Sequence, residues 1–339
     1  MPDIAVIGAG LIGRRHADLI HRRGWLSALV DPAPAAQDYA QTLGVECFAD
    51  LADYLTKNRP DGAVIATPNQ LHLTHGTACI AAGVPVLIEK PLADTSEAGK
   101  ALVQSARAAQ VPVLVGHHRR HNPLIHTAKA AIAEGRLGRV VSVHGQFWLY
   151  KPDDYFDVGW RKQAGAGPVF INLIHDIDLL RYLCGDVVSV QARQANAVRG
   201  HEVEDTAVIL LEFASGALGT VNVSDTIAAP WSWEMTAGEN PAYPNTAEAC
   251  YRIGGTEAAL SVPDLRLWHH PTARSWWAPI EAETLTYEAS DPLERQLDHF
   301  GEVITGATAP LVSAEEGLKT LQVTEAIQHA AVTGKIVDL

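Results

Sequence analysis

From residue 3 to about residue 116, short apolar runs alternate with stretches that have a helical pattern of apolar and polar positions. Apolar runs bounded by polar residues or Gly are typical of strands that are buried on both faces of a parallel sheet. The pattern predicts six strands joined by helices. The strands are expected at 4–7, 26–30, 45–48, 62–66, 85–88 and 112–115, and the helices at 12–23, 35–43, 51–58, 71–82 and 96–109.

Beyond Gly138 the pattern changes to longer runs in which apolar and polar residues alternate. A period of two predicts strands with one face on a core and the other face in solvent, as in an open, mostly antiparallel sheet. A connecting helix is expected between residues 116 and 138. The strands are expected at 140–150, 187–198, 206–213, 217–226 and 258–262, and further helices at 172–183, 293–305 and 314–333.

A glycine-rich turn lies between the first predicted strand and the first helix. Gly8, Gly10 and Gly13 follow the G-x-G-x-x-G spacing, with Leu11 and Ile12 at the start of the helix. The first glycine allows a tight turn, the second lets the backbone approach a pyrophosphate, and the third lets the helix pack closely on the sheet. The helix N-terminus would face the phosphate charge. In this context the turn predicts a dinucleotide-binding site.

Asp31 ends the second predicted strand, where its carboxylate would accept hydrogen bonds from the adenosine ribose. The same carboxylate would repel a 2′-phosphate, and no Arg follows it in the segment 31–34. NAD is therefore favoured over NADP as the cofactor. The alternative is an ordinary glycine-rich turn with Asp31 as a solvated loop residue.

These patterns predict two domains, since 339 residues exceed the size at which single hydrophobic cores stop growing. Residues 1–120 are expected to form an NAD-binding Rossmann domain with a doubly wound parallel sheet. Residues 121–339 are expected to form an α+β domain for substrate binding and oligomerisation. The last helix is a candidate to pack back on the first domain.

The charge and cysteine content narrow the class of partner. A formal net charge of -13 argues against nucleic-acid and anionic-membrane partners, because both would require a basic face. Four scattered cysteines without C-x-x-C spacing are expected to be thiols in a reducing compartment. No signal-peptide pattern precedes the first strand, and no apolar run has membrane-spanning length. A cytoplasmic protein with a small-molecule partner is expected.

Glu89-Lys90-Pro91 follows the fifth predicted strand at the carboxyl edge of the sheet, where ligands bind in doubly wound folds. Lys90 is therefore placed to hydrogen-bond a reacting oxygen beside a nicotinamide. Burial would lower the pKa of Lys90 and Glu89 would oppose that shift, so its charge state stays open. An isolated E-K-P would be a surface ion pair, but the glycine-rich turn upstream favours a catalytic role.

A second polar set lies on the predicted helix 172–183, after the glycine-rich segment 165–167. Asn172, His175 and Asp176 share one face of this helix. His175 is a candidate to take the proton of a hydroxyl while hydride leaves the same carbon. The alternative is a capping Asn and a core His satisfied by an acidic neighbour.

His117, His118, Arg119, Arg120 and His121 follow the sixth predicted strand. The two arginines can clamp a carboxylate or a row of hydroxyls, or fasten the connecting helix through salt bridges, or divide these roles. The first two histidines are candidates for hydrogen bonds near the nicotinamide. No metal site is expected, because a strand end that passes into a loop does not hold three histidines convergent.

Together these motifs resemble the glucose-fructose oxidoreductase, inositol dehydrogenase and MocA family nearly from end to end. The E-K-P motif and the His-bearing helix are the most specific matches. The resemblance implies that Lys90 is the catalytic lysine and His175 the general acid/base. It also implies that the cofactor is lined by Thr67, Pro68, Asn69, His72 and Glu89, with Trp160 and Arg161 approaching from the second domain. The positions of Lys90 and His117 at strand ends add these two residues to the candidate cofactor contacts.

The chain departs from the family at one position. The commoner family pattern has an Asp four residues before the His, where this chain has Ile171, and Asn172 is its nearest replacement. An amide holds a hydroxyl but cannot accept its proton, so proton removal would rest on His175, with Lys90 as a candidate helper. The family substrate is therefore less transferable to this chain.

We expect an NAD-dependent dehydrogenase that oxidises a secondary alcohol of a sugar, cyclitol or polyhydroxylated acid. The candidate substrate-binding residues are Asn172, Arg119, Arg120 and Asp176. Two alternatives stay open: an NAD-recycling glycoside hydrolase or lyase that acts by oxidation and elimination, and a non-catalytic nucleotide or sugar sensor. A homodimer or homotetramer is expected, because exposed faces of open sheets commonly pair with a second subunit.

Overall fold

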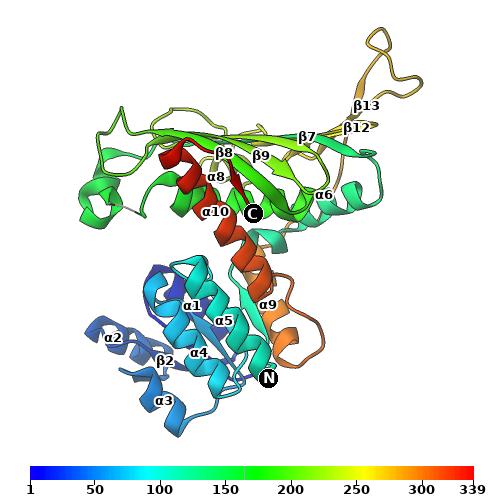
Figure 1. Ribbon diagram of the computed structural model, residues 1–339. Coiled ribbons are helices and arrows are strands. Elements are labelled where there is room, and N and C mark those ends of the chain that lie inside the picture. The colour runs from blue at the N-terminus through cyan, green and yellow to red at the C-terminus, as the bar shows by residue number, and fades with distance from the viewer. Residues whose placement is uncertain (164) are drawn as a thin grey trace. The chain divides into compact units, whose positions relative to one another are not determined.

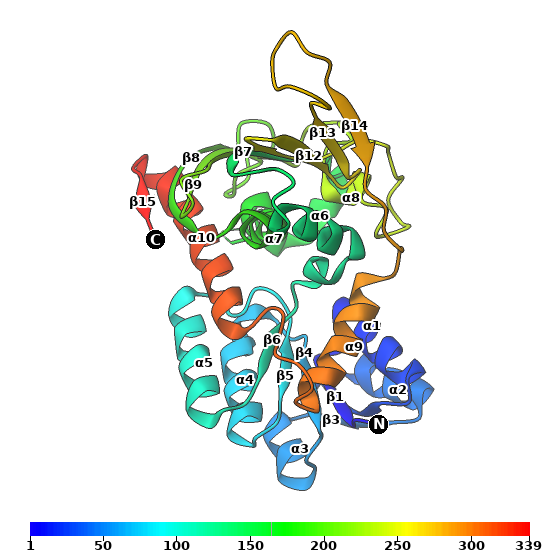
Figure 2. The same ribbon diagram turned by 90° about the vertical axis from the view of Figure 1, so that its right-hand side faces the viewer.

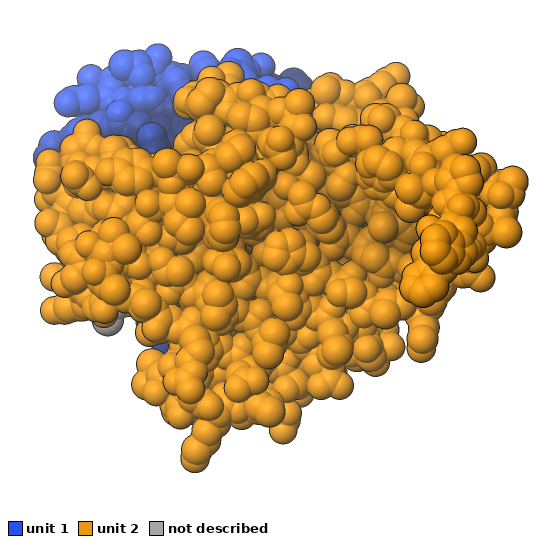
Figure 3. All heavy atoms as spheres, turned by 90° about the horizontal axis from the view of Figure 1, so that it is seen from above, with its two compact units in different colours: residues 1–118, 293–321 blue, residues 119–292, 322–339 orange. Residues whose placement is uncertain are grey.

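The computed structural model describes residues 1–163 and 165–339 of the chain. These residues form two compact units, which Figure 3 shows in two colours. Unit 1 comprises residues 1–118 and 293–321, and unit 2 comprises residues 119–292 and 322–339. The functional labels given above to residues 1–120 and 121–339 stay predictions.

Unit 1 contains the predicted doubly wound sheet. Its strands are all parallel and follow the order β3-β2-β1-β4-β5-β6, so the direction of winding reverses between β1 and β4. Continuous runs of buried residues form β1, β4, β5 and β6, as expected where helices cover both faces. The strands are β1 Ile4–Ile7, β2 Leu26–Val30, β3 Glu46–Phe48, β4 Gly62–Ile65, β5 Val86–Ile88 and β6 Val113–Val115.

The helices of unit 1 begin and end within one residue of the predicted positions. Asp50 and Thr95 cap two of them by accepting a hydrogen bond from a backbone N–H of the first turn, and Gly44 ends another in the left-handed conformation. They are α1 Leu11–Arg22, α2 Pro34–Leu43, α3 Leu51–Lys57, α4 His72–Ala81 after a 3₁₀ turn at Asn69–Leu71, α5 Ser96–Ala109 and α9 Pro292–Ile304.

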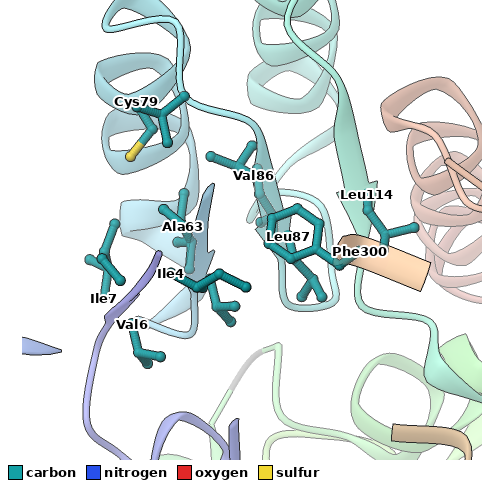
Figure 4. Packing of buried hydrophobic residues seen from close by; sticks show 14 of the residues in the cluster. Ile4, Val6, Ile7, Ala63, Cys79, Val86, Leu87, Leu114 and Phe300 are labelled. Atoms are coloured by element: carbon teal, nitrogen blue, oxygen red, sulfur yellow. The ribbon is translucent and has the colours of Figure 1, made fainter. Parts of the chain in front are cut away.

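Helix α9 completes the core of unit 1 although it is distant in sequence. Leu297 and Phe300 are fully buried in the same apolar cluster as the strands, and Figure 4 shows Phe300 with residues of β1, β4, β5 and β6. A Cβ atom added to Gly62 on β4 would lie 2.5 Å from Cδ1 of Ile304. The helix therefore packs directly on the sheet backbone.

Unit 2 is built on a nine-stranded sheet in the order β14-β13-β12-β11-β7-β10-β9-β8-β15. All neighbouring pairs are antiparallel except β7 and β10, which run parallel. The expected mostly antiparallel sheet is confirmed. Its strands are β7 Val140–Trp148, β8 Val187–Ala195, β9 Thr206–Phe213, β10 Leu218–Ser224, β11 Tyr251–Gly255, β12 Ala258–Val262, β13 Arg266–His269, β14 Glu281–Thr284 and β15 Val337–Asp338.

One face of this sheet is covered and the other is exposed. Buried residues of α6, α7 and the second half of α10 share an apolar cluster with the strands. On β9, buried Ile209 and Leu211 alternate with the exposed Val208 and Leu210. The chain between β13 and β14 extends away from the sheet in both ribbon views (Figures 1 and 2). The helices are α6 Pro123–Ala133, α7 Ile174–Cys184, α8 Trp233–Thr236 and α10 Ala314–Thr333.

Several elements of unit 2 differ from the prediction. Strands β11, β13, β14 and β15 were not expected. β14 is exposed at every position, β15 has two residues, and β11 alternates over only three residues before it ends in two glycines. The predicted helix 172–183 begins instead as a π-helical turn, Val169–Leu173, before α7. No helix of the described chain is both long enough and apolar enough to cross a bilayer.

Candidate active site

The glycine-rich turn of unit 1 lies at the carboxyl end of β1, beside the point where the strand order reverses. Gly8 has a φ of +93°, and a Cβ atom on it would lie 2.7 Å from Ala66 O. A Cβ atom on Gly13 would lie 1.9 Å from Gly8 O. Both positions therefore require glycine for close packing of turn, helix and strand.

The N-terminus of α1 is open and suits an anionic ligand. Gly10 caps the helix without a side-chain hydrogen bond, and no described atom lies within 4 Å of a Cβ atom placed on it. Leu11, in the first turn, is 95% exposed, which leaves an apolar surface beside unpaired backbone N–H groups. The open space, the free N–H groups and the exposed leucine fit a dinucleotide pyrophosphate.

Asp31 follows β2 and is tied to the glycine-rich turn. Its Oδ2 accepts from the backbone N–H of Ala9 at 2.7 Å, and its Oδ1 accepts from Ala33 N at 2.8 Å. Each carboxylate oxygen has a further lone pair, so Asp31 can also accept from ribose hydroxyls. This geometry fits the predicted adenosine contact.

The Glu89-Lys90-Pro91 turn follows β5 at the same sheet edge. Glu89 is buried, and His16 of α1 donates from Nε2 to its Oε1 at 2.7 Å. Burial opposes ionisation of Glu89, but the hydrogen bond from His16 and the charges of His118 and Lys90 hold its pKa below the ordinary value. Glu89 therefore acts as a buried anion that fixes the turn carrying Lys90, whose side chain is partly exposed.

His72 connects two loops of the same edge. Its Nδ1 lies 2.8 Å from Pro91 O and its Nε2 lies 2.9 Å from Thr67 O, so both ring nitrogens are used within the protein. The segment Thr67, Pro68 and Asn69 is thereby held beside the Lys90 turn. His117, after β6, is buried at the next strand end. In the described chain no group of three or more His, Cys, Asp or Glu side chains is arranged to hold a metal ion.

In unit 2 the candidate helix begins with an unusual turn. Asn172 lies in the π-helical turn Val169–Leu173, and the partly exposed His175 follows it in the first turn of α7. Glu204 Oε1 accepts from the N–H of Val169 at 2.9 Å, and a Cβ atom on Gly167 would lie 2.1 Å from that oxygen. The glycine before the helix thus makes room for Glu204. Such π turns are frequent at functional sites.

A cavity of about 580 Å³ opens beside Asn172 within unit 2. Lys151 lines the cavity, is 7% exposed, and donates from Nζ to Asn172 Oδ1 at 2.8 Å. Its volume suits a small-molecule ligand. The lining consists of Leu149, Tyr150, Lys151, Pro152, Tyr155, Asn172, Ala228, Ala229, Met235 and Tyr243.

The parallel pairing of β7 and β10 explains why these residues meet. Carboxyl ends of parallel neighbours lie at one sheet edge, which places Lys151, after β7, beside Asp225, after β10. Lys151 Nζ lies 3.5 Å from Asp225 Oδ2, and Arg199 donates from Nε to Asp225 Oδ1 at 3.0 Å. Burial lowers the pKa of Lys151, although Asp225 opposes this shift.

Arg119 and Asp176 belong to a buried polar cluster with Glu234 and Tyr251. Arg119 donates from Nη2 to Glu234 Oε1 at 2.7 Å, and its Nη1 lies 3.7 Å from Asp176 Oδ1. The hydroxyl of Tyr251 donates to the same Asp176 oxygen. Burial raises the pKa of Asp176 to about 7, and the Arg119 charge only partly offsets this effect.

Arg120 and Arg161, two further candidate residues, have different surroundings. Arg120 donates from Nε and Nη2 to the two carboxylate oxygens of Asp178 on α7, at 2.8 and 2.7 Å, and both residues are buried. Arg161 donates to Tyr155 O at 2.7 Å and stacks on the Tyr155 ring. Trp160, beside it, is 55% exposed.

Sequence reasoning missed Lys151 and the cavity around it. The available signal was Lys151-Pro152 shortly after a predicted strand, which repeats the placement of Lys90-Pro91. The aromatic residues Tyr155 and Tyr243 lie in segments without periodic patterns, so only the folded chain brings them to Asn172.

Comparisons with known proteins agree with this arrangement. A model of the oxidoreductase family with an NAD-binding Rossmann fold matches residues 3–117, and a model of the GFO/IDH/MocA C-terminal domain matches residues 125–261. The chain is 30% identical to 1,5-anhydro-D-fructose reductase of Ensifer adhaerens, over 82% of this chain and 80% of the relative. It is 33% identical to levoglucosan dehydrogenase of Pseudarthrobacter phenanthrenivorans, over 66% of this chain and 67% of the relative.

Among solved structures, the fold is similar to that of the WlbA dehydrogenase from Bordetella pertussis in complex with NADH and UDP-GlcNAcA. The TM-score is 0.80 at 28% identity, and the match covers 99% of this chain and 98% of that one. The predicted family, fold class and NAD cofactor are confirmed by these matches. The chain belongs to the GFO/IDH/MocA family of NAD-binding oxidoreductases.

Proposed function

We propose that the protein is an NAD-dependent dehydrogenase that oxidises a secondary alcohol of a sugar, cyclitol or polyhydroxylated acid. The observation that carries the proposal is the open N-terminus of α1, bounded by glycines that tolerate no side chain at Gly8 and Gly13. This arrangement leaves the N-terminus of α1 open to an anionic group such as a dinucleotide pyrophosphate. The cavity beside Asn172 in unit 2 supplies a compartment of suitable size for the second substrate.

Bound NAD⁺ supplies the acceptor for the hydride that leaves the carbinol carbon, and NADH supplies the hydride in the reverse direction. In the proposed reaction His175 takes the hydroxyl proton and Lys90 hydrogen-bonds the reacting oxygen. Asn172 holds a further substrate oxygen. The reaction requires the carbinol carbon to come close to the nicotinamide with its hydrogen directed toward the ring.

The cofactor-binding residues are part of the proposal. Backbone N–H groups of the turn and of α1 would bind the pyrophosphate, and Asp31 would bind the adenosine ribose. Glu89 and His72 fix the Lys90 turn and the Thr67 loop, which supports an indirect role for both. The full proposed set is Gly8, Gly10, Leu11, Ile12, Gly13, Asp31, Thr67, Pro68, Asn69, His72, Glu89, Lys90, His117, Trp160 and Arg161.

The contacts in unit 2 support different roles for the four predicted substrate-binding residues. The double hydrogen bond of Arg120 to Asp178 supports a fastening role on α7. Arg119 Nε and Nη1 are buried and have no hydrogen-bond partner among the described residues, which supports Arg119 over Arg120 as the proposed substrate donor. The full burial of Asp176 supports positioning of Arg119 rather than contact with substrate. Asn172 stays the proposed direct contact.

The relatives support a sugar-like substrate. Two of them are named for 1,5-anhydro-D-fructose and levoglucosan, and the WlbA structure contains UDP-GlcNAcA. The names differ in the sugar, so they support the class of substrate and leave its identity to experiment.

The test is the absorbance of reduced nicotinamide when the purified protein meets NAD, and separately NADP, with a panel of sugars, inositols and sugar acids. An increase with NAD on one group of substrates is the expected result. Sugar release without net NADH would indicate the NAD-recycling hydrolase or lyase instead. NAD binding without any turnover would indicate the sensor.

The proposed assembly is a homodimer or homotetramer. Val208, Leu210 and Leu218 are 47 to 61% exposed on one face of the sheet in unit 2, and such apolar faces are typical of subunit contacts. We place the protein in the cytoplasm, with no nucleic-acid or membrane partner. The four cysteines are free thiols, which supports a reducing compartment.

A further inference from the structure

The cavity of unit 2 has an asymmetric chemical lining. Of the described residues that line it, Lys151 is the only charged one, and most of the others are apolar or aromatic. Lys151 lines the cavity and is 7% exposed, so contacts within the protein hold its side chain at the cavity wall. A buried lysine at a cavity wall is costly unless it has a binding or structural role.

The hydrogen bond between Lys151 and Asn172 determines which atom of the Asn172 amide is available to a ligand. A lysine ammonium only donates, so the Asn172 atom 2.8 Å from Nζ must be the acceptor Oδ1. The amide group is thereby oriented, and its Nδ2 has no acceptor among the described residues. Both members of the pair offer N–H groups to a ligand. Their matching ligand group is an oxygen that accepts hydrogen bonds and has no proton to donate.

The carboxylate that pairs with Lys151 is shared with a second cation. Asp225 Oδ2 lies 3.5 Å from Lys151 Nζ and Asp225 Oδ1 lies 3.0 Å from Arg199 Nε, and Arg199 Nη1 also lies 3.5 Å from the exposed Asp153. Glu234 is already paired with Arg119 at 2.7 Å. Burial raises the pKa of Glu204, although the charge of Lys151 opposes this shift, and burial also raises the pKa of Tyr155.

We propose that Lys151 and Asn172 form a carboxylate-binding subsite, so that the substrate is a sugar acid or related hydroxy acid rather than a neutral sugar. The inference rests on the proposed function, because it assigns the substrate class of the same cavity. One carboxylate oxygen would accept from Lys151 Nζ and the other from Asn172 Nδ2. A carboxylate provides only acceptors and a negative charge, which matches both properties of the pair.

The subsite also predicts a dependence on pH. Burial lowers the pKa of Lys151, and loss of its proton removes the charge that attracts the acid. Acid binding should therefore weaken as the pH rises through the pKa of Lys151. The groups that face Lys151 and influence this titration are Asp225, Glu234, Arg199, Glu204 and Tyr155.

The experiment is calorimetric titration of the full-length protein, in the presence of NAD, with matched acid and neutral ligands. The pairs are D-glucuronate and D-glucose, D-galacturonate and D-galactose, and D-gluconate and D-glucitol. At least one acid is expected to bind about tenfold or more tightly than its neutral partner. The preference should decrease from pH 7 to pH 10.

Two variants test the residues. Lys151→Met should weaken acid binding about tenfold or more and reduce the preference for the acid over its neutral partner. Asn172→Asp keeps a strong partner for Lys151, so it should fold, but it places a second carboxylate in the subsite and should weaken acid binding about tenfold. Lys129→Met is the matched control, since Lys129 is also partly buried and donates to a carbonyl, Tyr182 O, away from the cavity.

Equal or weaker binding of every acid than of its neutral partner would overturn the subsite, and so would an unchanged acid preference in both variants. Binding of an acid without NADH formation would support the subsite and contradict the proposed dehydrogenase. NADH formation only with neutral ligands would contradict the subsite and support the proposed dehydrogenase.

Discussion

Two lysines of this protein stand directly before a proline and shortly after a strand. Lys90 follows β5 in unit 1, and Lys151 follows β7 in unit 2. Each of these lysines therefore lies near the end of its strand, at the edge of a sheet, where its amine can reach a ligand. Lys90 was predicted because a glycine-rich turn accompanies it. Lys151 was not, because its companions Asn172 and Asp225 are distant in sequence.

Replacement of Lys90 tests the catalytic assignment. Lys90→Met should lower kcat by about a hundredfold or more, because the reacting oxygen loses its hydrogen-bond donor. NAD affinity, measured by fluorescence titration, should change little. Lys100→Met on α5 is the control, since Lys100 is half exposed and lies 3.9 Å from Glu97. An unchanged rate in Lys90→Met would remove Lys90 from the mechanism.

The buried carboxyl of Asp176 predicts a dependence of stability on pH. Its pKa rises from 3.8 to about 7 on folding, so the folded state holds the proton more tightly than the unfolded chain. The stabilisation is complete below pH 4 and is lost as the pH rises to about 7, with a size on the order of 4 kcal/mol.

Asp176→Asn cannot ionise, while its amide oxygen can still accept from Tyr251. Urea unfolding of both proteins from pH 5 to pH 8 should show a decrease in the free energy of unfolding for the wild type that the variant lacks. Parallel pH profiles of the two proteins would contradict the assignment of this titration to Asp176.

At the residue scale, spacing in the sequence identified groups but not their partners. Gly8, Gly13 and Lys90 were predictable because each has a fixed place relative to a strand end. The pairing of Arg120 with Asp178 joins residues 58 positions apart, and that of Lys151 with Asn172 joins residues 21 apart. No periodic pattern specifies such contacts, since they depend on how the elements pack.

At the element scale, the strand-turn-helix unit β1-α1 offers a matched pair of glycines. Gly13→Ala would place Cβ 1.9 Å from Gly8 O, a backbone atom that cannot move away easily, and should destabilise the protein by about 1 to 3 kcal/mol. Gly10→Ala meets no described atom within 4 Å and should leave the melting temperature nearly unchanged.

The same Gly10→Ala variant should weaken NAD binding about tenfold or more, because its methyl group would lie where the pyrophosphate approaches the backbone. Thermal melting and NAD titration of both variants check the two effects separately. Full NAD affinity in a folded Gly10→Ala protein would contradict the proposed position of the dinucleotide.

Elements were predictable wherever one period dominated a segment. The parallel strands and their helices in unit 1 lie within one residue of the predictions, since buried runs and glycine stops mark both ends. Strand β14 lacks an apolar face, and β15 has two residues, so pairing with a neighbouring strand alone defines them. The π turn at Val169–Leu173 has the composition of an ordinary helix and was therefore not distinguishable.

At the scale of the whole molecule, the exposed apolar residues predict association. The mass of one chain is 36.4 kDa, and light scattering should give two or four times this value. Val208→Lys with Leu210→Lys should dissociate the assembly, because each charge would be buried in the subunit contact. Trp276→Ser with Trp277→Ser is the comparison, as both indoles are nearly fully exposed on the chain between β13 and β14. A monomeric wild type would contradict the proposed assembly.

The return of residues 293–321 to unit 1 has a consequence for biosynthesis. Leu297 and Phe300 fill the core beneath the parallel sheet, so that core stays incomplete until the ribosome has translated all of β7 to β14. The apolar surface of the unit 1 sheet therefore stays uncovered while residues 119–292 are synthesised. A ribosome-bound chain that ends before residue 293 should bind chaperones that recognise exposed apolar segments. The full-length folded protein should not bind them.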